Sequence, residues 1–236
     1  MGKSEADDKI LSYNDVVLRR SDLGILSGPY FLNDRIIEFH LSYLSSSHPS
    51  QDILLVPPSI AFWIIQCPVV EALKDFLDPL HLSDKKLVLF PINNNDDVNI
   101  SEGGSHWSLL AYYRNANVFV HHDSCRSMNA TPAKKLYKAV VGYMGLSESG
   151  SKAGYLEWTD SPRQANGYDC GLYVTAIARV ICEWYVNSSK KTDANDLWFS
   201  VVKEQVTPSA VACMRSEILA LIRDLMARNS GQHAQQ

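Results

Sequence analysis

Apolar residues recur at helical spacing in two parts of the chain. The first stripe follows Asn33 or Asp34, either of which can cap the start of a helix. Its apolar members are Ile36, Ile37, Phe39, Leu41 and Leu44. The second stripe follows Thr207-Pro208, where proline suits the first helical position, and runs to about Arg228. Its apolar members are Val211, Met214, Ile218, Leu221, Ile222 and Leu225. Both stripes predict helices that pack against a core.

A third apolar run begins after Cys170. It contains more apolar residues than a helix needs when only one of its faces is buried. Its members are Leu172, Tyr173, Val174, Ala176, Ile177, Val180, Ile181 and Trp184. This density predicts a buried helix that begins at or just after the cysteine.

Other segments have the pattern of β-strands. Residues 86–92 form a short apolar run that predicts a buried strand. Residues 103–113 and 118–124 carry apolar, aromatic and β-branched side chains and flank a mostly polar tetrapeptide, which predicts a β-hairpin beside that strand. Strands and helices together predict an α+β fold.

The register of this hairpin decides which side chains meet at its open end. A turn centred on Arg114-Asn115 places His106 directly opposite Asp123, whereas a wider loop over 114–117 places Ser108 there. With either turn, His106 and Asp123 lie near each other at the strand ends. Opposed residues have Cβ atoms about 4.5 to 5.5 Å apart, which allows a carboxylate to fix the tautomer of an imidazole. A strand-edge histidine beside a solvated aspartate is the structural alternative.

The stretch Gln164-Ala-Asn-Gly-Tyr-Asp-Cys-Gly171 places Cys170 at the start of the predicted buried helix. Unpaired amides and the dipole at a helix N-terminus favour the thiolate, which is the nucleophilic form of cysteine. Gly171 leaves room for a substrate backbone, and Gln164 can donate a hydrogen bond to a developing oxyanion. The stretch has the features of half an active site, although a buried apolar cysteine next to a solvated amide would show the same residues.

Length and composition are those of one globular domain. The chain has 236 residues, 46% of them hydrophobic, and no long Gly/Ser/Pro linker divides it. We therefore expect a disordered lead over residues 1–9, a single catalytic domain over 10–228 and a polar tail over 229–236.

Charge and cysteine content narrow the classes of partner and compartment. The formal net charge is -4, and no basic run suggests nucleic acid, so a protein partner is expected. The five cysteines are odd in number and irregularly spaced, the N-terminus lacks an apolar signal segment, and no run approaches the roughly 18 apolar residues of a membrane span. These features predict a protein of the cytoplasm or nucleus with no membrane partner.

Several motifs in the same order resemble the ubiquitin-like-protein-specific cysteine proteases of the Ulp/SENP group. The motifs are His106-Trp107, Asp123-Ser124, Gln164 and Asp169-Cys170-Gly171. Other segments resemble the deneddylase branch more closely: Leu11-Ser12-Tyr13, Leu32-Asn33-Asp34-Arg35-Ile36-Ile37, Ile92-Asn93-Asn94-Asn95 and the run from Gly103 to Leu110. The resemblance covers roughly residues 10 to 225. It implies a papain-like fold with a central mixed sheet flanked by helices.

The resemblance also implies a role for each motif. Cys170 would be the nucleophile, His106 the general base, Asp123 its orienter and Gln164 the oxyanion-hole side chain. Trp107 would help to form a narrow channel for a Gly-Gly tail. The aromatic before Leu-Asn-Asp is often tryptophan in this family and is Phe31 here. The further residues expected to read the tail of the modifier are Asp34, Asn93, Asn94, Asn95, Asp96 and Asp97, with a solvated loop as the alternative for residues 93–97. His121 and His122 are expected to be structural.

The expected function is removal of a neddylation-type modifier from lysines of target proteins and trimming of its precursor after Gly-Gly, without a cofactor. Three alternatives stay open at this point. The chain could be a SUMO-specific protease, or a non-catalytic domain that binds a ubiquitin-like protein. A metal-binding module is the third, with possible ligands His106, His121, His122, Asp123, Cys125 and Cys170. The third lacks any Cys-x-x-Cys or His-x-x-x-His pair.

Overall fold

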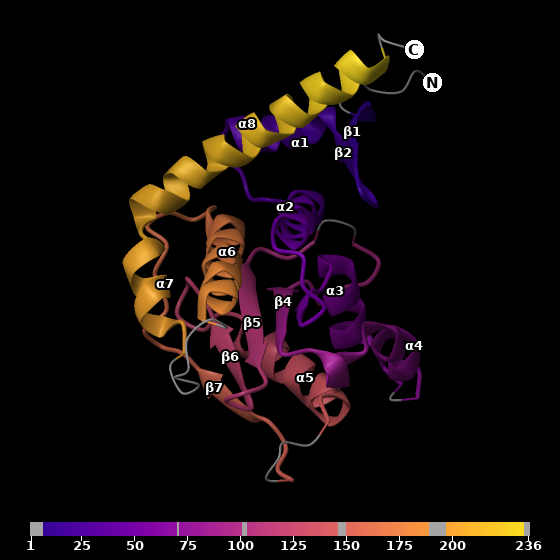
Figure 1. Cartoon of the computed structure of the whole chain (residues 1–236), viewed down its shortest axis with the longest axis vertical. Helices are drawn as coiled ribbons and strands as arrows, with labels where there is room; N and C mark the ends of the chain where they lie inside the picture. Colours follow the sequence, from indigo (N-terminus) through magenta and orange to yellow (C-terminus); the bar gives the residue numbers. More distant parts are fainter. Residues whose placement is uncertain (1–6, 70, 101–102, 146–149, 189–196, 234–236) are drawn as a thin grey trace.

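A five-stranded mixed sheet lies at the centre of the molecule (Figure 1). The computed structural model describes residues 7–69, 71–100, 103–145, 150–188 and 197–233. The strands, in their order across the sheet, are β3 (Ile53–Leu55), β4 (Leu87–Asn93), β5 (Trp107–Tyr113), β6 (Val118–His122) and β7 (Gly154–Glu157). Strand β5 is antiparallel to both β4 and β6, whereas the outer strands β3 and β7 are parallel to β4 and β6, respectively. The predicted α+β fold with a mixed sheet is confirmed.

Helices cover both faces of the sheet. They are α1 (Arg20–Ser27), α2 (Asp34–Ser47), α3 (Pro58–Gln66), α4 (Leu73–Leu77), α5 (Ala130–Val140), α6 (Cys170–Ser188), α7 (Phe199–Gln205) and α8 (Pro208–His233). Short 3-10 turns occupy 78–80, 82–84 and 141–143. A separate hairpin of β1 (Lys9–Tyr13) and β2 (Val16–Arg19) lies with α1 beside the long helix α8 (Figure 1).

The alternation of side chains along the strands divides the core in two. Leu87, Leu89 and Leu109 belong to the core shared with α2 and α6, while Val88 and Phe90 belong to the core shared with α3 and α5. Successive side chains of a strand point to opposite faces. Because helices cover both faces, β4 is apolar and buried from Leu87 to Ile92, which explains the continuous run predicted as a buried strand.

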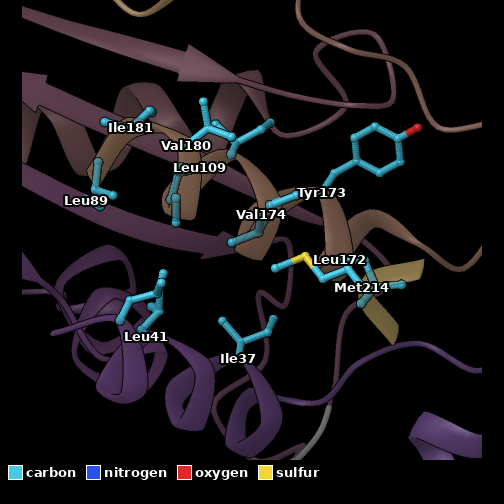
Figure 2. Packing of buried hydrophobic residues seen from close by; sticks show 14 of the residues in the cluster. Ile37, Leu41, Leu89, Leu109, Leu172, Tyr173, Val174, Val180, Ile181 and Met214 are labelled. Carbon is cyan, nitrogen blue, oxygen red and sulfur yellow. The ribbon is translucent and has the colours of Figure 1, made fainter. Parts of the chain in front are cut away.

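Helix α6 carries Cys170 and is buried among several elements (Figure 2). Val174 and Ile181 of α6 face Leu109 of the sheet, and Ile37 of α2 and Met214 of α8 lie close by in the same cluster. A fully buried aliphatic side chain contributes about 1.5–3 kcal/mol relative to its exposed state. This packing fixes the start of α6, and with it the position of the cysteine.

The structure decides the bounds of the first and last predicted helices. The Asn33 side chain accepts a hydrogen bond from the Ile36 amide at 3.0 Å, so Asn33 is the cap and Asp34 is the first helical residue. Helix α8 begins at Pro208, as predicted, but it runs to His233 instead of about Arg228. Residues 229–233 of the expected polar tail are therefore helical. At the other end, β1 starts at Lys9, while residues 1–6 of the expected lead lie outside the described residues.

The hairpin of β5 and β6 has the wider of the two loops considered. Tyr113 pairs with Val118, so the loop spans residues 114–117. The Asn117 amide donates to the Arg114 carbonyl oxygen at 2.9 Å, and Asn117 has a φ of 47°. Asparagine adopts this left-handed conformation more easily than most residues, which closes the four-residue loop. The alternative prediction, a narrower turn centred on Arg114-Asn115, is wrong.

Candidate active site

Cys170 is the first residue of α6. The Tyr173 amide donates to the Asp169 carbonyl oxygen at 3.0 Å, which makes Asp169 the capping position and places the sulfur at the helix N-terminus. The thiol is buried, with 1% of the residue exposed. The local sequence produces this arrangement because the apolar run starts directly after a loop rich in polar side chains. The predicted helix start is confirmed.

His106 and Asp123 are joined as the hairpin pattern predicts, but through a different register. His106 Nε2 lies 2.7 Å from Asp123 Oδ1, and both side chains are buried. The wider loop places Asp123 opposite Ser108, so His106 is the diagonal neighbour, which is still within reach of a long side chain. Since Nε2 faces the carboxylate, Nδ1 is the ring nitrogen that can hydrogen-bond to Cys170.

The carboxylate of Asp123 is held by three donors. Besides His106, the backbone amides of Cys125 and Asn129 donate to its Oδ1 and Oδ2 at 2.7 and 2.8 Å. Burial raises the pKa of Asp123, but these hydrogen bonds outweigh it and lower the pKa below its ordinary value. Burial likewise lowers the pKa of His106, and its hydrogen bonds to Asp123 and Cys170 outweigh this and raise the pKa to about 9. The site therefore favours the imidazolium form of His106 beside the Asp123 carboxylate.

Two asparagines fix the backbone of His106. Asn94 Oδ1 accepts from the amides of Ser105 and His106 at 2.7 and 3.0 Å. Asn129 Nδ2 donates to the carbonyl oxygens of Ile92 and His106, both at 3.2 Å. Sequence reasoning missed Asn129 as a site residue. Its place before the α5 apolar stripe is that of a helix cap, which is the one signal that singles it out.

Gln164 is held next to the hairpin end. Its Oε1 accepts from the Ser124 hydroxyl at 2.7 Å, and its Nε2 donates to the Asn166 carbonyl oxygen at 2.6 Å. A side-chain amide has two N–H groups, so this arrangement leaves one for an oxyanion. Ser124 orients Gln164 and was not among the residues expected to do so.

A third residue missed from the sequence is Arg215, on α8. Its Nη2 donates to Asp169 Oδ1 at 2.8 Å and to the Tyr30 carbonyl oxygen at 2.9 Å, and its Nη1 donates to the Ile25 carbonyl oxygen at 2.9 Å. The pair with Asp169 is nearly buried. This arginine connects the residue before Cys170 to the segment that precedes Phe31.

Gly171 is required by packing within the protein. A Cβ atom there would lie 2.8 Å from Leu32 Cβ, closer than real Cβ contacts. Leu32 therefore occupies the space beside Gly171 that was expected to admit a substrate backbone. The same segment accepts a hydrogen bond from Trp107, whose Nε1 lies 3.0 Å from the Leu32 carbonyl oxygen.

A cavity of about 580 Å³ lies beside His106 and contains most of the residues expected to bind substrate. Phe31, Asp34, Asn93, Asn95 and Trp107 line it. The other apolar side chains in its lining include Phe62, Trp63, Val98 and Ile100. We call it the larger cavity.

The amides of the loop before His106 have partners inside the protein. Asn93 Oδ1 accepts from the Asn95 amide at 2.7 Å, and Asn95 Nδ2 donates to the Ile100 carbonyl oxygen at 3.0 Å. Asn94 faces Ser105 and His106 and does not line the larger cavity. Asp96 and Asp97 do not line it either. The direct contribution of these side chains to substrate binding stays a prediction.

His121 and His122 lie inside the fold, where they have structural partners. His121 Nε2 lies 2.9 Å from the Ser108 hydroxyl, and its Nδ1 lies 2.8 Å from Glu157 Oε1. His122 Nε2 accepts from Trp198 Nε1 at 2.9 Å, and burial is the main cause that lowers the pKa of His122 to about 3. In the described residues, no group of three or more histidine, cysteine, aspartate or glutamate side chains is arranged to hold a metal ion.

Comparison with known proteins assigns these features to a family. Residues 30–207 match the Ulp1 protease family, C-terminal catalytic domain. The chain belongs to this family. NEDD8-specific protease 1 of Arabidopsis thaliana is 56% identical to it over 229 residues, which cover 97% of this chain and 99% of that protein. Human sentrin-specific protease 8 is 32% identical over 222 residues, covering 93% and 98%.

Solved structures of Ulp1-type proteases have the same fold. The Ulp1 protease domain in complex with Smt3, the yeast ortholog of SUMO, superimposes with a TM-score of 0.62 at 19% identity, covering 94% of this chain and 90% of that one. A de-sumoylating protease gives a TM-score of 0.67 at 17% identity, covering 96% and 94%. As a Ulp1-family protein, the chain is a cysteine peptidase. Within its described part, no helix is long and apolar enough to span a membrane.

Proposed function

We propose that this Ulp1-family protease is a deneddylase, which releases a neddylation-type modifier from lysines of target proteins and trims its precursor after Gly-Gly. The 56% identity to a NEDD8-specific protease over 97% of the chain carries this proposal. The assembled cysteine, histidine and aspartate support catalysis over a purely binding role. A protein that only held its partner would have no need of a buried imidazole between a thiol and a carboxylate.

The geometry gives each group a step in the reaction. The Cys170 thiolate attacks the carbonyl carbon of the terminal glycine, and Gln164 Nε2 with the Cys170 amide stabilises the oxyanion. His106, held by Asp123 as the imidazolium, gives its proton to the leaving lysine amine. The amine departs and a thioester remains. His106 then takes a proton from water, and the hydroxide attacks the thioester carbon. The C–S bond breaks, which releases the modifier with a free carboxyl terminus and regenerates the Cys170 thiolate.

The larger cavity is the proposed place for the tail of the modifier. Trp107 and Phe31 supply aromatic surface next to His106, and glycine residues in a tail leave room for such a close approach. Phe31 is about half exposed, which leaves its ring free to cover the tail. Val98 and Ile100 add apolar side chains to the lining of this cavity.

Covalent trapping with C-terminally activated modifiers tests this proposal. We expect the neddylation modifier to label Cys170 faster than SUMO or ubiquitin does, because discrimination depends on contacts beyond the shared Gly-Gly. Cys170→Ala is the control and should show no label. Equal or faster labelling by SUMO would instead assign the chain to SUMO processing, and absence of label with every modifier would overturn catalysis at Cys170.

A further inference from the structure

A second cavity, of about 450 Å³, lies on another side of His106. Ser105 and His106 line both cavities, and no other residue is shared. Gln164, the proposed oxyanion donor, lines only this smaller cavity. The proposed function places the tail of the modifier in the larger cavity, so the other half of the scissile bond extends toward the smaller one.

The smaller cavity is basic. Arg126 and Arg163 line it, and no aspartate or glutamate belongs to its described lining. In the part of the chain that the structure describes, Arg126 makes no hydrogen bond or ion pair with another residue. Arg163 uses one guanidinium nitrogen, Nη2, on the Thr159 carbonyl oxygen at 2.6 Å. An arginine has five N–H donors, so both side chains have donors left for an incoming anion.

Both arginines are carried by backbone that is tied to the catalytic residues. Arg126 and Ser127 have φ values of 51° and 63°, in a turn that starts directly after Asp123. Consecutive left-handed residues other than glycine are strained and persist only where surrounding contacts hold them. Here the Ser127 hydroxyl is hydrogen-bonded to Glu157, which turns that side chain inward while Arg126 stays exposed.

The backbone of Arg163 is anchored from the other side. Its carbonyl oxygen accepts from the Tyr173 hydroxyl at 2.7 Å, and Tyr173 lies one turn after Cys170 on α6. The two positive side chains therefore stand on separate segments, one fixed to the carboxylate of the site and one to the helix of the nucleophile.

We propose that the smaller cavity binds the target side of the isopeptide bond and that Arg126 and Arg163 select lysines flanked by acidic residues. This inference rests on the proposed function for the direction in which substrate lies. Exposed charge pairs are individually weak, so two of them predict a preference of about threefold to tenfold in kcat/KM, reduced by added salt.

Two matched substrates test the proposal. Each is the neddylation modifier joined through its terminal glycine to the lysine of a short peptide, with aspartates beside the lysine in one and asparagines in the other. The wild-type protein should cleave the acidic conjugate about threefold to tenfold faster at about 50 mM salt. The double variant R126Q/R163Q should cleave both at the same rate. Arg223→Gln, at an exposed position of α8 outside both cavity linings, is the matched control and should keep the preference.

A fluorogenic amide of the modifier, which has no peptide on the target side, separates this inference from the proposed function. The double variant should hydrolyse it as the wild type does. Equal wild-type rates on the two conjugates, or a preference that survives in R126Q/R163Q, would overturn the role of the arginines. Failure to cleave any neddylation conjugate would contradict the proposed function instead, and the same peptide pair joined to SUMO would then test the cavity.

Discussion

The reacting groups and the wall of the larger cavity meet at His106 but differ in how the fold treats them. Cys170, His106 and Asp123 are between 1% and 3% exposed, and each has hydrogen-bond partners within the protein. On the wall, Phe31 and Trp63 are 49% and 45% exposed. Groups that perform chemistry are therefore fixed before substrate arrives, whereas groups that recognise a partner are left uncovered until the partner buries them. Changes in the first region should lower kcat, and changes in the second should raise KM.

The largest expected effect is removal of the nucleophile. Cys170→Ala should reduce turnover by about a millionfold, as removal of the nucleophile does in another hydrolase, while modifier binding persists. Steady-state hydrolysis and calorimetric titration of the modifier check the two halves of this prediction. Normal turnover would remove Cys170 from the mechanism, and loss of binding together with turnover would make its role structural.

The next largest effect should come from the carboxylate. Asp123→Asn should lower kcat by about 10⁴-fold, the effect of the same change in another triad, because the amide neither selects the tautomer nor stabilises the imidazolium. Since the pKa of His106 is raised to about 9, wild-type kcat/KM should fall as pH rises through this value and the proton for the leaving amine is lost. In the variant this alkaline limb should move to lower pH. A pH profile with an unmoved limb would contradict the assignment of Asp123.

Gln164→Ala should have a smaller effect on the same region. Removal of one oxyanion donor costs about 10²–10³ in kcat elsewhere, and the Cys170 amide remains as a second donor. KM should be unchanged. Ser124→Ala is the control, because it frees Gln164 Oε1 without removing the donor, and should cost less. Equal activity of wild type and Gln164→Ala would exclude the oxyanion role.

Arg215 lies on α8, outside residues 30–207 that match the family. Its substitution tests whether the buried catalytic residues depend on this helix. Arg215→Met removes the positive partner of the nearly buried Asp169 carboxylate and leaves it the Asn166 amide as a side-chain donor, so the free energy of unfolding should fall by about 3 kcal/mol. Chemical denaturation measures it, and the alkylation rate of Cys170 in the folded protein reports whether the nucleophile has moved. Arg228→Met, in an exposed pair with Asp224, should change stability by less than about 0.5 kcal/mol. If the double variant with Asp169→Asn recovers none of the loss, the ion pair is not its cause.

The smallest effect is expected on the exposed wall. Phe31→Ala should raise KM for the modifier about tenfold, since burial of an aromatic ring contributes about 1.5–3 kcal/mol, and should leave kcat and stability nearly unchanged. Phe31→Trp, which keeps an aromatic ring and enlarges it, should keep KM at or below the wild-type value. A fall in kcat with constant KM in Phe31→Ala would break the division between the two regions.

Much of the catalytic cluster could be predicted because its signals are local. The start of α6 follows from the apolar run after Cys170, and the proximity of His106 to Asp123 follows from the hairpin pattern whichever loop closes it. The register itself was not decided, because both loops satisfy the same alternation and only the left-handed Asn117 distinguishes them. The amides at 93–95 were expected to face substrate, yet they have hydrogen-bond partners inside the protein as well.

Local pattern in the sequence was enough to predict α2, α6, α8 and the strands β4, β5 and β6, and to name the residues that can carry the reaction. The contacts of Asn129 with His106, of Ser124 with Gln164 and of Arg215 with Asp169 became visible only in the folded chain. The physical reason is the range of the interactions. Periodicity and capping act between residues a few positions apart, whereas the partners of a buried polar group are brought together by packing of distant segments, and no local pattern records them.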